Sequence, residues 1–173
     1  DAVRRVRDGA TVIVGGSGAG HALPQAFIVP LAEVFTEEGR PRDLTTVRVV
    51  GIGDFADRGF SQLALPGLMK RTIGSNIGNE PRLGKLVETG EVEAYSFPQG
   101  VLSQLCREIA AGRPGLVTAV GLNTYVDPRQ TGGKTKSGEC RMSSGPVTSS
   151  TGSGKRRRCH TMDRWRSVMG NTR

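Results

Sequence analysis

The chain has 173 residues, 3 cysteines and a formal net charge of +8. Residues 131–173 contain 10 basic and 2 acidic residues and so carry the whole net positive charge, whereas residues 1–130 are formally neutral. The basic balance therefore describes a terminal segment and is no evidence for a nucleic-acid-binding domain. The sequence has no run of about 18 apolar residues, which excludes a typical transmembrane helix. Three scattered cysteines indicate neither a disulfide framework nor a metal site, so we expect a cytoplasmic protein.

The first half of the chain alternates short apolar runs with glycine-rich turns. Residues 10–16 (ATVIVGG) are nearly all apolar and β-branched, which is typical of a strand buried on both faces. The glycine turn GGSGAGH follows at 15–21, and apolar residues at helical spacing then predict a helix that ends at Gly39. Pro30 should kink this helix or mark the start of its regular part. A second strand is predicted at 45–50.

The rest of the body continues the same alternation. The predicted elements are a glycine loop at 51–59, a strand at 70–74, a helix from Pro81 to Gly90, a strand at 92–97, a helix from Pro98 to Gly112 and an apolar run at 116–122. This order predicts an α/β domain with a mainly parallel sheet. In such domains the functional loops lie at the carboxyl ends of the strands. Here those ends are rich in glycine and polar residues, which indicates a ligand site.

The turn GGSGAGH has three competing interpretations. If Gly16 and Gly18 are the first two glycines of a dinucleotide fingerprint, His21 stands where the third belongs. Glu37 and Glu38 could supply its acidic residue, but they lie at the end of a helix rather than of a strand. The turn could instead only pack a strand against a helix. It could also present backbone N–H groups to an acyl or phosphate-bearing ligand.

Gln99 is the most specific candidate for a binding residue. In FPQG the strand ends, Pro98 turns the chain, and Gln99 enters the first helical turn, where its amide can point into a crevice or be solvated. His21 lacks an obvious serine, cysteine or carboxylate partner for catalysis. Asp54 and Asp57 could form an acid pair, although carboxylates in glycine loops are more often turn formers.

Several blocks together resemble a known family. They are DGATVIVGGSGAGH at 8–21, PRDLTTVRVVGIGD at 41–54, RGFSQLALPGLMKRTIGSNIGNEPRLGKL at 58–86, EAYSFPQGVLSQLCREIAAGRPGLVTAVGLNTYVDPR at 93–129 and GGK at 132–134. The chain is similar over residues 1–134 to the N-terminal, or α, half of a family I coenzyme A transferase of the acetate/3-ketoacid branch. The resemblance implies a three-layer α/β domain. Ser17, where the family has an aromatic, and the displaced Pro24 are departures that bear on the shape of the acyl pocket.

The resemblance also implies a reaction and its binding residues. In the family, CoA passes between carboxylates in a ping-pong reaction through a glutamyl-CoA thioester. That glutamate lies in the C-terminal, or β, half, so we expect no catalytic nucleophile in this chain. Gln99 matches the glutamine beside the reacting acyl group, Gly18 and Gly20 match the glycine loop, and Asn76 lies in the third loop of the same crevice. CoA or acyl-CoA is then a substrate, and no metal or permanently bound cofactor is expected.

The remaining residues, 135–173, carry no periodicity and no Leu, Ile or Phe. We interpret them as a disordered tail, either natural or translated out of frame, with the basic run at 155–158 solvated. The chain begins within a helix-like pattern and is interpreted as a fragment that needs a β half, in the same or another chain, within a homo- or hetero-oligomer. We expect no transferase activity without that half. The alternatives are a non-catalytic acyl-CoA-binding module and a nucleic-acid binder acting through its tail.

Overall fold

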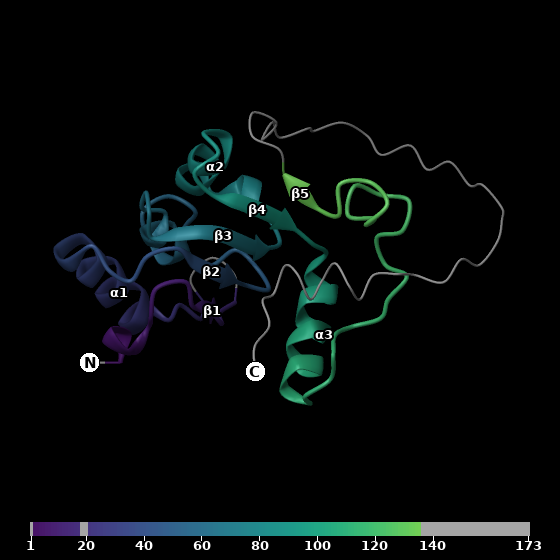
Figure 1. Cartoon of the computed structure of the whole chain (residues 1–173), viewed down its shortest axis with the longest axis horizontal. Helices are drawn as coiled ribbons and strands as arrows, with labels where there is room; N and C mark the ends of the chain where they lie inside the picture. Colours follow the sequence, from purple (N-terminus) through teal and green to yellow (C-terminus); the bar gives the residue numbers. More distant parts are fainter. Residues whose placement is uncertain (1, 18–20, 136–173) are drawn as a thin grey trace.

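The computed structural model describes residues 2–17 and 21–135. Their centre is a five-stranded sheet in the order β1 (Thr11–Ile13), β2 (Leu44–Val47), β3 (Met69–Gly74), β4 (Glu93–Ser96), β5 (Lys134–Thr135) (Figure 1). The first four strands are parallel, and β5 pairs antiparallel with β4. The predicted tail, apart from Thr135, lies outside the described residues, as do Gly18 and Gly20.

The helices lie on both faces of the sheet, in three layers. Helices α1 (Gln25–Glu38) and α2 (Pro81–Glu88) share one apolar core, whereas α3 (Gln99–Ala110) contributes Leu102 to a second core cluster. The second cluster also contains Val47, Ile73, Phe97 and Val126, which come from β2, β3 and the segments that follow β4 and α3. Short 3-10 turns complete the fold at Val3–Arg5, Gly59–Leu63 and Ile77–Asn79. The predicted α/β class with a mainly parallel sheet is confirmed.

Strand β2 is buried at all four residues because it lies between β1 and β3 and contributes Leu44 to one core cluster and Val47 to the other. Its polar side chains find partners inside the sheet: the hydroxyls of Thr46 and Thr72 lie 3.1 Å apart in a hydrogen bond. Buried hydroxyls are tolerated when they are bonded in this way. Strand β1 is an edge and is correspondingly more exposed.

The structure decides two points that the sequence left open. Helix α1 begins at Gln25, so Pro30 lies inside the helix and does not mark its start. The apolar run at 116–122 lies outside the sheet: its Val117 is 73% exposed, and the edge beside β4 is taken by β5.

No helix in residues 2–17 and 21–135 is both long enough and apolar enough to cross a membrane. Within the same residues no group of three His, Cys, Asp or Glu side chains is arranged to hold a metal ion.

Candidate functional site

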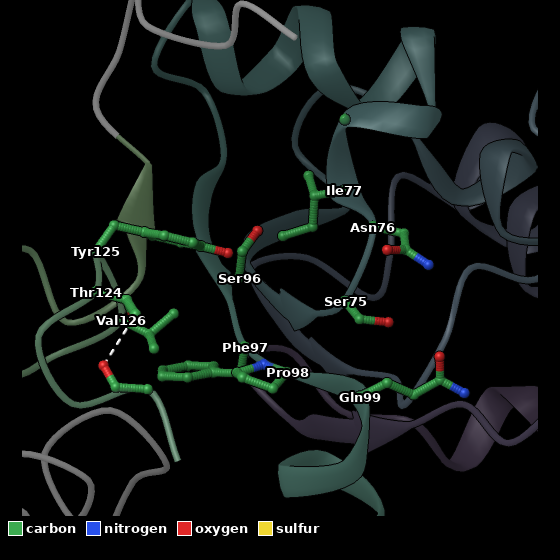
Figure 2. Close-up of a pocket in the computed structure, with 12 residues that line it drawn as sticks. Ser75, Asn76, Ile77, Ser96, Phe97, Pro98, Gln99, Thr124, Tyr125 and Val126 are labelled. Atoms are coloured by element: carbon green, nitrogen blue, oxygen red, sulfur yellow. Dashed lines mark hydrogen bonds between the residues drawn. The ribbon is translucent and has the colours of Figure 1, made fainter. Parts of the chain in front are cut away.

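A pocket of about 590 Å³ opens at the carboxyl ends of β3 and β4 (Figure 2). Three segments line it: Ser75–Gly78 after β3, Ser96–Gln99 after β4, and Gly121 with Thr124–Val126 from further along the chain. Ligands bind at this edge of parallel sheets because the loops there converge while the strands hold them rigidly. The two predicted residues that the structure describes, Asn76 and Gln99, both line this pocket.

Asn76 is placed by the turn that ends β3. Ser75 donates its hydroxyl to the Val49 carbonyl at 2.7 Å, which ties the start of the turn to the chain after β2. Asn76 then takes a left-handed backbone conformation with φ of 55°, which asparagine tolerates better than most residues. Its carbonyl accepts the Asn79 N–H at 3.1 Å and begins a 3-10 turn. The side chain is therefore left exposed at the pocket.

Gln99 is placed by the junction of β4 and α3. The Phe97 N–H donates to the Gly74 carbonyl at 3.0 Å, so the end of β4 is fixed to the end of β3. Pro98 precedes α3, and its carbonyl accepts the N–H of Val101 at 3.0 Å. Gln99 is the first residue of α3 and so lies in the first helical turn, as the sequence predicts, and its side chain is exposed. In Figure 2 the amides of Gln99 and Asn76 lie on the same side of the pocket.

The opposite wall is a segment that sequence reasoning did not assign to the site. We call residues 121–133 the strap. Figure 2 shows the Tyr125 ring extending toward Ser96, with Val126 beneath it near Phe97. Val126 is buried in the second core cluster, whereas Tyr125 is more than half exposed. The pocket lining thus includes an aromatic and an apolar side chain on one side and two primary amides on the other.

Hydrogen bonds within the strap fix Tyr125 in this place. The Tyr125 carbonyl accepts the Gly133 N–H at 3.0 Å and the Thr131 hydroxyl at 2.5 Å. The Gly133 carbonyl in turn accepts the Ser96 N–H at 2.8 Å, which joins the strap to β4. The strap is thus joined to β4 by a backbone hydrogen bond, and the Thr131 hydroxyl adds a side-chain bond within it.

Asp127 organises the interior of the strap. Its carboxylate is 1% exposed and accepts the N–H groups of Asn123 at 2.8 Å and Arg129 at 2.9 Å. The Arg129 guanidinium bonds both carboxylate oxygens. These donors, with the guanidinium as the largest influence, hold the pKa of Asp127 well below its usual range. The pattern Asp-Pro-Arg was the available signal, because a carboxylate and a guanidinium two residues apart in a turn readily pair.

The other sequence candidates lie elsewhere. Asp54 is a turn former: one of its oxygens accepts the N–H groups of the three residues 56–58 at 2.8 to 3.0 Å. Asp57 forms an exposed ion pair with Arg82, so the two aspartates do not form an acid pair. His21 is exposed and is not part of the pocket wall.

The departures at Ser17 and Pro24 also stay outside the pocket wall in the described part of the chain. The backbone of Ser17 pairs with that of Ala22 across the glycine turn, with N···O distances of 3.2 and 3.3 Å. Pro24 precedes α1, and its carbonyl accepts the Phe27 and Ile28 N–H groups. Ser17 therefore lies beside Ala22, and Pro24 lies at the start of α1.

With this architecture established, comparison with known proteins identifies the class. The family model described as Coenzyme A transferase matches residues 1–156, and the chain belongs to that family. The match runs past residue 134, where the resemblance was expected to end. The predicted family is confirmed.

Three individual proteins of known name are similar in sequence to this chain. The chain is 42% identical over 134 residues to acetate CoA-transferase YdiF of Escherichia coli (strain K12), covering 78% of this chain and 25% of the relative. It is 41% identical to caffeate CoA-transferase of Acetobacterium woodii, with the same coverage of each chain. The acetate CoA-transferase subunit alpha of Escherichia coli (strain K12) is 34% identical over 127 residues, covering 73% of this chain and 54% of that subunit.

A solved structure shares the fold. The acyl-CoA transferase YdiF of Escherichia coli O157:H7, in a thioester complex with CoA, superposes with a TM-score of 0.71 and 40% identity. The superposition covers 79% of this chain and 27% of that one. The chain thus spans about a quarter of the YdiF proteins and about half of the alpha subunit.

Proposed function

We propose that this chain is the α half of an acyl-CoA:carboxylate CoA-transferase of the acetate/3-ketoacid type, with acyl-CoA as substrate and no permanently bound cofactor. One observation carries the proposal. In a member of the coenzyme A transferase family, Gln99 and Asn76 line one pocket at the carboxyl ends of neighbouring parallel strands. The names of the relatives, which include acetate CoA-transferases and an acetate CoA-transferase alpha subunit, support the substrate class.

The proposed reaction uses a glutamate carboxylate on a β half as nucleophile. In the first half-reaction this carboxylate attacks the acyl-CoA thioester. The CoA sulfur moves to the glutamyl carbonyl, and the acyl group leaves as a carboxylate carrying one of the glutamate's oxygens. In the second half-reaction another carboxylate takes CoA from the glutamyl thioester by the reverse route, and the glutamate is regenerated.

Gln99 contributes to this reaction as a hydrogen-bond donor. Its amide N–H can bond the acyl oxygen, on which negative charge develops when the thioester is attacked. A preorganised donor of this kind contributes about 10²- to 10³-fold to the rate of acyl transfer. Asn76 supplies a second amide to the same oxygen or to the incoming carboxylate. The wall formed by Tyr125 and Val126 holds the apolar part of the acyl group.

The β half belongs to the same chain or to a second one. Both arrangements have a parallel among the relatives, because this chain matches a quarter of the YdiF proteins but half of a separate alpha subunit. On this proposal the described residues provide the acyl pocket and the β half provides the nucleophile. The chain alone is therefore inactive.

CoA transfer from acetyl-CoA to short carboxylates tests the proposal, with the chain alone and mixed with the β half of a close relative. We expect activity only in the mixture. Gln99→Ala should lower kcat by about 10²-fold, because one oxyanion donor is lost. Gln104→Ala is the matched control, since Gln104 is an exposed glutamine on the same helix outside the pocket wall. Activity in the chain alone, or equal rates for the two variants, would refute the assignment.

A further inference from the structure

A buried ion pair lies behind the pocket. The guanidinium of Arg48 bonds Glu80 Oε1 through Nη1, and both side chains are 0% exposed. The guanidinium also lies over the Phe60 ring, 4.2 Å from its centroid. Among the described residues no hydrogen-bond partner meets Arg48 Nε, Arg48 Nη2 or Glu80 Oε2. Three of the five side-chain nitrogen and oxygen atoms of the pair are thus buried without a hydrogen bond.

Stability does not explain such a pair. Taking two charges out of water costs several kcal/mol per ion, and each unpaired buried polar group adds to that cost. Burial accordingly raises the pKa of Glu80, because the charged carboxylate is disfavoured there. Apolar residues of similar volume in the place of a buried pair often leave a protein as stable or make it more stable. The pair therefore calls for an explanation based on geometry.

The ion pair joins the residue that follows β2 to the residue that precedes α2. Arg48 directly follows β2, and its N–H donates to the Ile73 carbonyl at 3.0 Å. Its side chain fills the space beside Gly74, where an added Cβ would lie 2.9 Å from Arg48 Cγ. Glu80 precedes α2, and its carbonyl accepts the Gly84 N–H at 2.8 Å. Arg48 thus connects the sheet to the first turn of α2.

Between these anchors lies the loop of residues 75–80, four residues of which line the pocket. Its start is tied to the sheet by the Ser75 hydroxyl and its end by the Glu80 carboxylate. Asn76 lies between the two ties in a left-handed conformation, which few residues adopt without support. The loop is short, so fixing both ends restricts the direction of the Asn76 amide.

We propose that Arg48 and Glu80 are positioning residues that hold the loop of residues 75–80, and with it the Asn76 amide, in the shape that the pocket requires. The inference rests on the proposed function only for the identity of the ligand. The shape and order of the loop are properties of the free protein and can be measured without one.

The test uses the full chain and the double variant Arg48→Met/Glu80→Leu. We expect a urea midpoint equal to or above that of the wild type, because the buried charges are removed together. Hydrogen exchange at the Asn79 and Glu80 amides should rise about tenfold or more, and the Asn76 side-chain signals should broaden. Amides of α1 serve as the internal control and should not change.

A second variant covers the case in which the double variant does not fold. Glu80→Gln keeps the size of the side chain and one acceptor oxygen but removes the charge, so it should show the same effect on the loop at smaller amplitude. Unchanged exchange at Asn79 and Glu80 in a folded variant would overturn the proposal. In the mixed transferase assay the double variant should lower kcat/KM while its stability is retained. If the wild type itself is inactive there, the proposed function fails and the loop result still decides this inference.

Discussion

Replacing Gly133 by alanine tests how tightly the strap is fixed to the sheet. Gly133 has a φ of 77°, a conformation in which a Cβ is strained. The added Cβ would also lie 2.5 Å from the Ser96 carbonyl oxygen, well inside van der Waals contact. The strap must then move away from β4, and the Ser96 N–H to Gly133 carbonyl bond of 2.8 Å is lost or stretched.

The loss in the free energy of unfolding that Gly133→Ala causes can be compared with that of a matched control variant. A left-handed alanine costs about 1–2 kcal/mol relative to glycine. Gly112→Ala should show this strain alone, because Gly112 has a φ of 67° and nothing within 4 Å of its added Cβ. Gly133→Ala adds a lost hydrogen bond of about 1 kcal/mol and the clash itself. We expect about 2–4 kcal/mol for Gly133→Ala.

Urea unfolding followed by circular dichroism measures both free energies. With a typical m-value of about 1–3 kcal/mol per molar urea, the midpoint for Gly133→Ala should lie about 0.5 M or more below that for Gly112→Ala. The same variant should weaken binding at the pocket, since Tyr125 moves with the strap. Equal midpoints for the two variants would show that the contact between the strap and β4 is not tight, and the reasoning about the pocket wall would be wrong.

Three further perturbations address the core, the strap and the second glycine loop. In urea titrations, Leu102→Ala should lower the free energy of unfolding by about 2–5 kcal/mol, because Leu102 is 1% exposed in the cluster beneath the pocket. Leu122→Ala is the control and should change it by less than about 1 kcal/mol, because Leu122 is 39% exposed. The hydrogen bonds that lower the pKa of Asp127 stabilise the fold above the ordinary carboxyl pKa of 3.8, and this contribution is lost progressively as the pH falls below that value. Asp127→Asn should therefore flatten the decrease of Tm with acid, and parallel Tm curves for the two proteins between about pH 5 and 2 would contradict this. Asp54→Ala should speed hydrogen exchange at the three backbone amides bonded to that carboxylate. Asp57→Ala is the control and should leave them unchanged. Equal exchange in both variants would show that the turn does not depend on Asp54.

Local sequence patterns predicted the order of elements and the place of Gln99. Both depend on short-range physics: β-branched runs favour strands, glycine in a left-handed conformation ends α1 at Gly39, and proline before α3 sets its first turn. The sequence left the place of Pro30 open, and the structure puts it inside α1, where Ile28 and Leu31 on either side are buried in the first core cluster. Asn76 was placed in the third loop by resemblance, and the structure brings its side chain to the pocket.

The α/β class, the order of strands and loops, and the family could all be predicted from the amino-acid sequence, since they follow from periodicity and from motifs contiguous in the chain. The pocket wall formed by Tyr125 and Val126 could not, nor could the ion pair between Arg48 and Glu80, which lie 32 residues apart. Both depend on pairings between distant segments: the antiparallel pairing of β5 with β4, and the approach of the end of β2 to the start of α2. No local pattern encodes such pairings, because what fixes them is the burial of side chains contributed by several elements at once.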